Sequence, residues 1–64
     1  MIYIGYITDQ NNDKIPLTYG TEEDMLSWKA LNLVQNNTTD LFLLPDNADP
    51  ALCLSDIEYF RSFL

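Results

Sequence analysis

Residues 20–28 read Gly-Thr-Glu-Glu-Asp-Met-Leu-Ser-Trp, and the rest of the chain is organised around this stretch. Thr21 is a favourable N-cap, because its hydroxyl can accept a hydrogen bond from the free backbone N–H groups of a first helical turn. Asp24 completes an aspartate variant of the capping box. Glu22, Glu23 and Asp24 stand at the positive end of the helix dipole, where each contributes about 0.3–1 kcal/mol. The stretch predicts the start of a helix. Helix initiation alone would account for these acids, and the alternative is a surface that also meets a basic partner.

A hairpin is predicted before this helix. Residues 2–8 are apolar on both faces, which favours a strand that is central in a sheet or covered on both sides. Gly5 within this strand indicates a bulge or a close approach by another group. Residues 9–13 have the composition of a turn, because Asn and Asp tolerate left-handed backbone conformations. Residues 14–19 alternate as a half-buried strand, and Pro16 places that strand at an edge or presents this position outward.

The helix is predicted over residues 22–35. Spaced at about 100° per residue, its apolar residues share one broad face, which we expect to be buried: Leu26, Ala30, Leu31, Leu33 and Val34. Met25 and Trp28 fall outside this face and project, one turn apart, towards the polar side that carries Asn32. Methionine and tryptophan are enriched in interface cores, so this pair is the strongest interface candidate. The alternative is that Trp28 folds over the hairpin or the second helix as part of the core.

The C-terminal half permits two interpretations. Residues 40–45 predict a short buried strand, and residues 51–54 predict a return strand that precedes a capping box of Ser55 and Glu58. A second helix would then run from residue 56 to the end. The competing interpretation starts the second helix at Pro50, a favoured first helical residue, with Asp49 as its cap.

These elements predict an α+β fold in a single domain, residues 1–64. The preferred order is ββαββα, a small antiparallel sheet with two helices on one face, and the alternative order is ββαβα. A chain of this length buries only about 60% of its unfolded surface. Its single cysteine leaves it no internal disulfide. We therefore expect compact local packing or self-association as a homodimer.

Charge is the most unusual global property of the chain. Ten acidic residues face three basic ones, which gives a net charge of −7. This balance argues against direct nucleic-acid binding and against association with anionic membranes, because both require clusters of Lys and Arg. It favours attraction to basic protein surfaces, including nucleic-acid-binding clefts. Solubility alone would also account for it.

Catalytic and metal-binding patterns are poorly supported. The chain has no histidine and no glycine-rich phosphate loop. Cys53 lies in an apolar run, where we expect a buried structural thiol. Asp9, Asn11 and Asp13 match the first ligand positions of a calcium loop, but Lys14 replaces the glycine that such a loop requires. We expect neither an enzyme nor a cofactor. No targeting segment is recognisable, so we expect a cytoplasmic protein.

The sequence therefore predicts a small acidic inhibitor or modulator that blocks a basic nucleic-acid-binding surface of a host protein. From its size and charge we expect a phage- or mobile-element-type protein, a nucleic-acid mimic of the anti-CRISPR or anti-restriction kind. The alternative is a self-associating, antitoxin-like or immunity-like adaptor with an apolar interface around Trp28. The residues expected to bind the partner are Glu22, Glu23, Asp24, Met25, Trp28 and Asn32.

Overall fold

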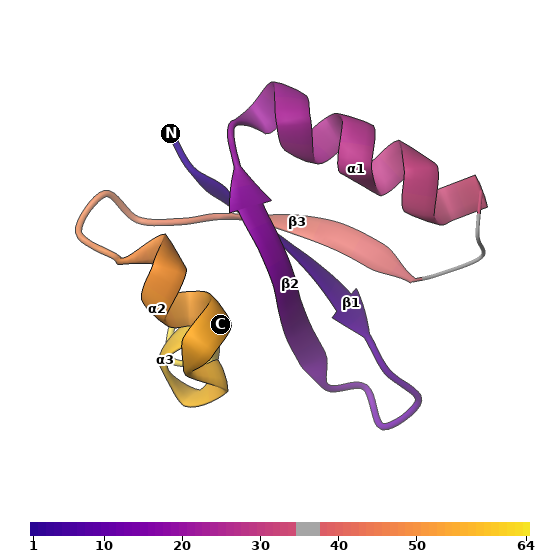
Figure 1. Ribbon diagram of the computed structural model, residues 1–64. Coiled ribbons are helices and arrows are strands. Elements are labelled where there is room, and N and C mark those ends of the chain that lie inside the picture. The colour runs from indigo at the N-terminus through magenta and orange to yellow at the C-terminus, as the bar shows by residue number, and fades with distance from the viewer. Residues whose placement is uncertain (35–37) are drawn as a thin grey trace.

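The computed structural model describes residues 1–34 and 38–64, and of residues 32–34 it describes the backbone only. The end of the first predicted helix at Gln35, and the loop that follows it, lie outside this description. The described elements are three strands and three helices, which confirms the α+β class: β1 (Tyr3–Thr8), β2 (Lys14–Gly20), α1 (Glu22–Val34), β3 (Thr39–Leu43), α2 (Pro50–Ser55) and α3 (Ile57–Arg61) (Figure 1).

Strand β1 is the centre of the sheet. The strand order is β2-β1-β3, and β1 pairs antiparallel with both neighbours. This position confirms the prediction from its two apolar faces. A register shift against β2 falls between Gly5 and Tyr6, which confirms an irregularity at the glycine. Because β2 and β3 run in the same direction on either side of β1, the chain must cross the sheet between them, and α1 makes this crossing (Figure 1).

The β1–β2 hairpin closes through its own side chains. The Asp9 carboxylate accepts hydrogen bonds from the backbone N–H groups of Asn11 and Asp13, each at 2.9 Å. Asn12 adopts a left-handed conformation with φ of 65°. Aspartate and asparagine are favoured in turns for these two reasons, so the predicted turn is confirmed.

The helices cover opposite faces of the sheet. The side chains of Ile4 and Tyr6 pack with Phe60 of α3 and Cys53 of α2. Successive strand residues point to opposite faces, and Gly5 lies against Trp28 of α1. The prediction of two helices on one face was therefore wrong. Its physical reason is β1 itself, which is apolar on both faces and needs a cover on each.

Residues 51–54 are helical, so the preferred ββαββα order was wrong at this point. Helix α2 begins at Pro50, and the Asp49 carboxylate accepts from the backbone N–H of Ala51 at 3.0 Å and of Leu52 at 3.4 Å. The alternative ββαβα order placed this start correctly. The second helix is nevertheless broken at Asp56, between α2 and α3.

The predicted capping box of Ser55 and Glu58 was also wrong. Asp56 is the N-cap of α3, because its carboxylate accepts from the backbone N–H groups of Glu58 at 3.1 Å and Tyr59 at 3.4 Å. Ser55 is the last residue of α2, and its hydroxyl donates backwards to the carbonyl of Leu52 at 3.3 Å. A residue whose backbone is already helical cannot serve as the N-cap of the next helix.

The main core lies between β1 and the two C-terminal helices. Phe60, Ile4 and Cys53 are its fully buried side chains. The Phe60 ring meets Phe42 edge-on, with 5.9 Å between ring centroids, and lies 6.0 Å from the ring of Tyr6. Such tilted and edge-to-face pairs are favourable arrangements of aromatic rings. The predicted burial of Cys53 is confirmed, and this burial raises the pKa of its thiol.

Candidate binding surface on the first helix

Helix α1 begins at the predicted Thr21 N-cap, whereas the return hydrogen bond of the predicted capping box, from the Thr21 N–H to the Asp24 carboxylate, stays a prediction. The Thr21 hydroxyl accepts from the backbone N–H of Asp24 at 3.3 Å, and the Thr21 carbonyl accepts from the N–H of Met25 at 3.0 Å. Glu22, Glu23 and Asp24 follow in the first turn, and all three are exposed. The cap therefore places three adjacent carboxylates at one corner of the molecule, beside the positive end of the helix dipole.

Tyr3 of β1 fixes the first of these carboxylates. Its hydroxyl donates to Oε2 of Glu22 at 2.9 Å. This hydrogen bond raises the pKa of Tyr3, because ionising the phenol would place a second negative charge beside Glu22. Tyr3 thus acts as a neutral donor that orients Glu22 without cancelling its charge.

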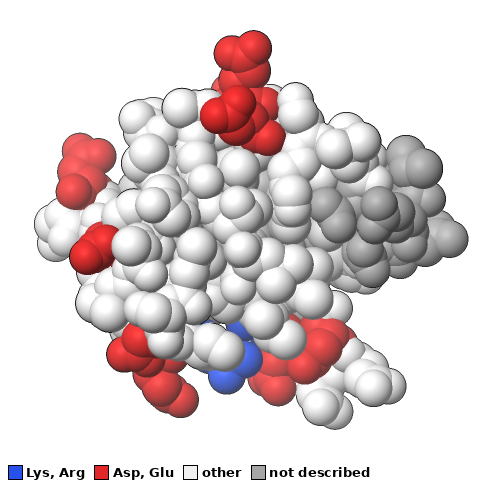
Figure 2. Space-filling view, viewed as in Figure 1, with Lys and Arg blue, Asp and Glu red and all other residues white. Residues whose placement is uncertain are grey.

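The basic residues lie away from this corner. Lys29, the basic residue of α1, forms an ion pair with Asp40 of β3, with 3.3 Å between Nζ and Oδ1. Arg61 donates from Nε to the backbone carbonyl of Lys14 at 3.4 Å. Figure 2 shows acidic atoms projecting from the edge where α1 begins and basic atoms near the opposite edge of the same view. The start of α1 is therefore one of several acidic edges in this view (Figure 2), and it is one without basic atoms beside it.

The face that α1 turns to the sheet differs from the predicted one. Met25 is only 5% exposed, and Trp28 is half-buried against Gly5. In contrast, Leu26 is 52% exposed and Leu31 is 67% exposed. The predicted orientation of the helix was therefore wrong, and Met25 offers no exposed side chain to a partner. Counting apolar residues favoured the leucine side, whereas the space above Gly5 accepts the larger indole.

The outward-facing side of α1 therefore carries an apolar surface, which we call the outer stripe: Leu26, Ala30 and Leu31. Glu22 lies one turn before Leu26, so the acidic corner leads directly into this stripe. Asn32 belongs to α1, but its side chain, like those of Leu33 and Val34, lies outside the described part of the chain. The structure thus brings acidic and apolar groups together on one exposed helix.

The sequence contained one signal for this orientation. A glycine in the middle of an apolar strand indicates a close approach, and Trp28 is the bulkiest side chain that α1 can bring to it. Pairing Gly5 with Trp28 would have turned Met25 inward as well, because residues three apart share a helix face.

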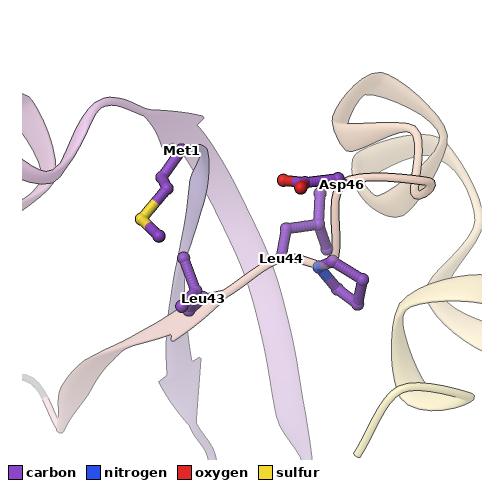
Figure 3. A pocket seen from close by; sticks show the side chains of 5 residues that line it. Met1, Leu43, Leu44 and Asp46 are labelled. Atoms are coloured by element: carbon purple, nitrogen blue, oxygen red, sulfur yellow. The ribbon is translucent and has the colours of Figure 1, made fainter.

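A small pocket lies at the same end of the sheet as the start of α1, beside the N-terminus, because Tyr3 pairs with both Gly20 and Leu43. Its volume is about 280 Å³, and its lining is formed by Met1, Leu43, Leu44, Pro45 and Asp46 (Figure 3). Asp46 contributes the one carboxylate, and the remaining lining is apolar. This volume is at the lower end of the range for ligand sites, which is about 300–1,000 Å³.

Within the described residues, no group of three or more His, Cys, Asp or Glu side chains is placed to hold a metal ion. Over the same residues, no helix is both long enough and apolar enough to span a bilayer. Comparisons with protein-family models, with curated proteins and with solved structures find no significant match to this chain. Its function must therefore be argued from its own surface.

Proposed function

We propose that this protein is a small acidic inhibitor or modulator that binds and blocks a basic surface of another protein. The observation that carries the proposal is that nearly all of its carboxylates lack an ion-pair partner within the described chain. Of the ten acidic residues, Asp40 alone forms an ion pair within the described chain. The other nine are not paired with a basic side chain among the described residues, and the three basic residues do not balance the ten acidic ones.

The class of target follows from this charge. A protein surface that binds nucleic acid carries Lys and Arg placed to neutralise phosphates. A compact acidic protein can occupy such a surface, because it presents fixed negative charges to the same cations. We therefore propose a nucleic-acid-processing host protein as the target, and a nucleic-acid mimic of the anti-CRISPR or anti-restriction kind as the mode of action.

The acidic corner at the start of α1 is the proposed centre of contact. Glu22, Glu23 and Asp24 are adjacent, exposed and held on a capped helix. Fixed charges bind more tightly than flexible ones, because less conformational freedom is lost on association. Trp28 contributes less to this surface than the sequence suggests, because it is partly buried and its ring packs on Gly5.

The proposal is tested by capture from a host-cell lysate at about 50 mM and about 200 mM salt, with and without double-stranded DNA as competitor. We expect the captured nucleic-acid-processing proteins to be released by the higher salt and by DNA, because both compete for the same cations. Capture that resists both would contradict the proposal and favour an apolar adaptor.

Matched variants then test the location of the contact. Glu22→Gln/Glu23→Gln and Asp13→Asn/Glu58→Gln each remove two exposed charges, and each pair includes a carboxylate from a first helical turn. We expect the first pair to slow association with a purified target more than the second pair does. Equal effects of the two pairs would place the contact elsewhere.

A further inference from the structure

We propose that the outer stripe of α1 docks the partner as a preformed helix laid into an apolar groove bordered by Lys or Arg. This inference rests on the proposed function and adds to it the docking surface and the chemistry of the groove. Helices that bind in grooves present apolar side chains about one turn apart on one face. Leu26 and Ala30 have this spacing, and Leu31, the residue after Ala30, borders this face on its other side.

The outer stripe is the exposed apolar part of α1 among the side chains that the structure describes. The helix already uses Met25 and Trp28 to cover the sheet. Leu26 and Leu31 nevertheless remain more than half exposed, at 52% and 67%. An amphipathic helix on a sheet normally carries polar residues on its outer side. More than half of each leucine side chain is therefore left uncovered by this fold, and the small Ala30 between them leaves room for a partner's backbone to approach.

The helix is held in place before any partner binds. Thr21 caps its start, Lys29 ties it to Asp40 of β3, and the Trp28 ring lies on Gly5 of β1. A preformed helix loses little conformational freedom on docking, so more of the contact energy contributes to affinity. This distinguishes the surface from a segment that must fold on its partner.

Charge decides which partner fits. Glu22 and Glu23 stand immediately before the stripe, at the positive end of the helix dipole, and both are exposed. The groove that receives this end must therefore carry cations along its border. A second copy of this chain fits poorly, because each copy has a net charge of −7 and the Lys29 of α1 is already paired with Asp40.

The test uses two helical-hairpin probe peptides that share one leucine-lined groove between their two helices and differ in the residues that border it, which are lysine in one and glutamate in the other. Binding to the intact protein is followed by fluorescence anisotropy of the labelled peptide. We expect the leucine–lysine peptide to bind and the leucine–glutamate peptide not to bind. We expect Leu26→Gln/Leu31→Gln to weaken binding by at least about tenfold.

The matched control is Leu52→Gln/Leu64→Gln, which also removes two exposed leucines, 40% and 53% exposed, one of them from a helix. These positions lie outside α1, so affinity should stay within about twofold of the original. Circular dichroism of all variants establishes that each is folded. An equal loss in both pairs would mean non-specific apolar contact and would overturn the proposed surface.

The remaining outcomes separate the two proposals. Leu26→Gln/Leu31→Gln could leave binding unchanged while salt and Glu22→Gln/Glu23→Gln weaken it. That result would overturn the docking surface and leave the proposed binding through carboxylates intact. If both peptides bind equally well, the basic border is refuted and the docking inference is overturned, while release of the captured target by salt and DNA still decides the proposed function. If light scattering shows a dimer of the free protein that Leu26→Gln/Leu31→Gln dissociates, a second copy occupies the stripe and the inference is overturned.

Discussion

The indole of Trp28 lies so close to Gly5 that a Cβ added at the glycine would stand 2.7 Å from Cζ3 of the ring. Helix α1 therefore docks on the central strand at a distance that only glycine permits. This contact turns Met25 towards the sheet and leaves Leu26 on the outside. One residue of β1 thus determines which side of α1 is available for binding.

Gly5→Ala should destabilise the fold, because the added methyl group must displace the Trp28 ring or the strand. We expect a loss of about 1–3 kcal/mol in the free energy of unfolding, measured by urea denaturation. Gly20→Ala is the control. A Cβ added there would lie 3.1 Å from the flexible end of Met25, so this substitution should lower the stability less. An unchanged urea midpoint for Gly5→Ala would contradict the contact.

Asp56→Ala should cost about 0.5–2 kcal/mol of stability, because it removes the acceptor for two backbone N–H groups at the start of α3. Asp56→Asn should retain most of this stability, since asparagine is a comparable N-cap. Ser55→Ala should lower the stability of the fold less than Asp56→Ala does. Thermal unfolding of the three variants checks this order, and the reverse order would restore the capping box predicted from the sequence.

Local features of this fold were predictable from the sequence. The hairpin turn and the Thr21 cap depend on hydrogen bonds between residues at most four positions apart, so their side chains identify them directly. The central position of β1 was also accessible, because a strand apolar on both faces needs neighbours on both sides.

Non-local features were not predictable in the same way. The orientation of α1 depends on Gly5, which lies in a strand more than twenty positions away from Trp28 in sequence. A run of four residues, 51–54, is too short for its periodicity to separate a strand from a helix. In the structure these residues form a helix, because Pro50 is its first residue and the Asp49 carboxylate accepts hydrogen bonds from the first free backbone N–H groups.

Thr39→Val should leave stability unchanged or raise it by about 1 kcal/mol. The Thr39 side chain is buried, and its hydroxyl has no hydrogen-bond partner among the described residues. A buried polar group without a partner is costly, and valine has nearly the same shape. Thr39→Ser is the control, because it keeps the hydroxyl, loses the methyl group and should lower the melting temperature. A clear loss of stability in the valine variant would show that the hydroxyl is hydrogen-bonded.

Glu22→Gln should lower the pKa of Tyr3 towards its ordinary value. The raised pKa of Tyr3 arises first from its hydrogen bond to the Glu22 carboxylate, and a neutral amide opposes phenol ionisation less. NMR titration of ring-labelled tyrosine resolves each residue. Tyr6 is an internal reference, because burial is the main cause of its raised pKa. If Glu23→Gln shifted Tyr3 as strongly as Glu22→Gln does, the specific hydrogen bond would be refuted.

Asp40 covers the free edge of the sheet. Leu44 donates to the Ile2 carbonyl, so alternate residues of β3 bond to β1 and the N–H of Leu41 points outward. The Asp40 carboxylate accepts from this N–H at 2.8 Å and pairs with Lys29. Because the Leu41 N–H already donates to Asp40, it is not available to pair with a strand of another molecule. Asp40 therefore protects this edge of the sheet against strand pairing.

This arrangement predicts a pH dependence. The hydrogen bond from Leu41, followed by the interaction with Lys29, lowers the pKa of Asp40 below its ordinary value. A depressed pKa in the folded state contributes stability that is complete above the unfolded-state pKa and is lost as the pH falls through the folded-state pKa. The contribution is small, because the Asp40 side chain is largely exposed. Urea midpoints should therefore fall less steeply across this acidic window in Asp40→Asn than in the original protein.

Asp40→Ala tests the protection of the edge separately from its charge. Asparagine retains an oxygen that can accept from the Leu41 N–H, whereas alanine leaves that N–H open. We expect concentration-dependent association in Asp40→Ala and none in Asp40→Asn, measured by light scattering at neutral pH. Association of both variants to the same extent would show that loss of the charge, rather than loss of the acceptor, exposes the edge. A monomeric Asp40→Ala would remove the proposed protective role altogether.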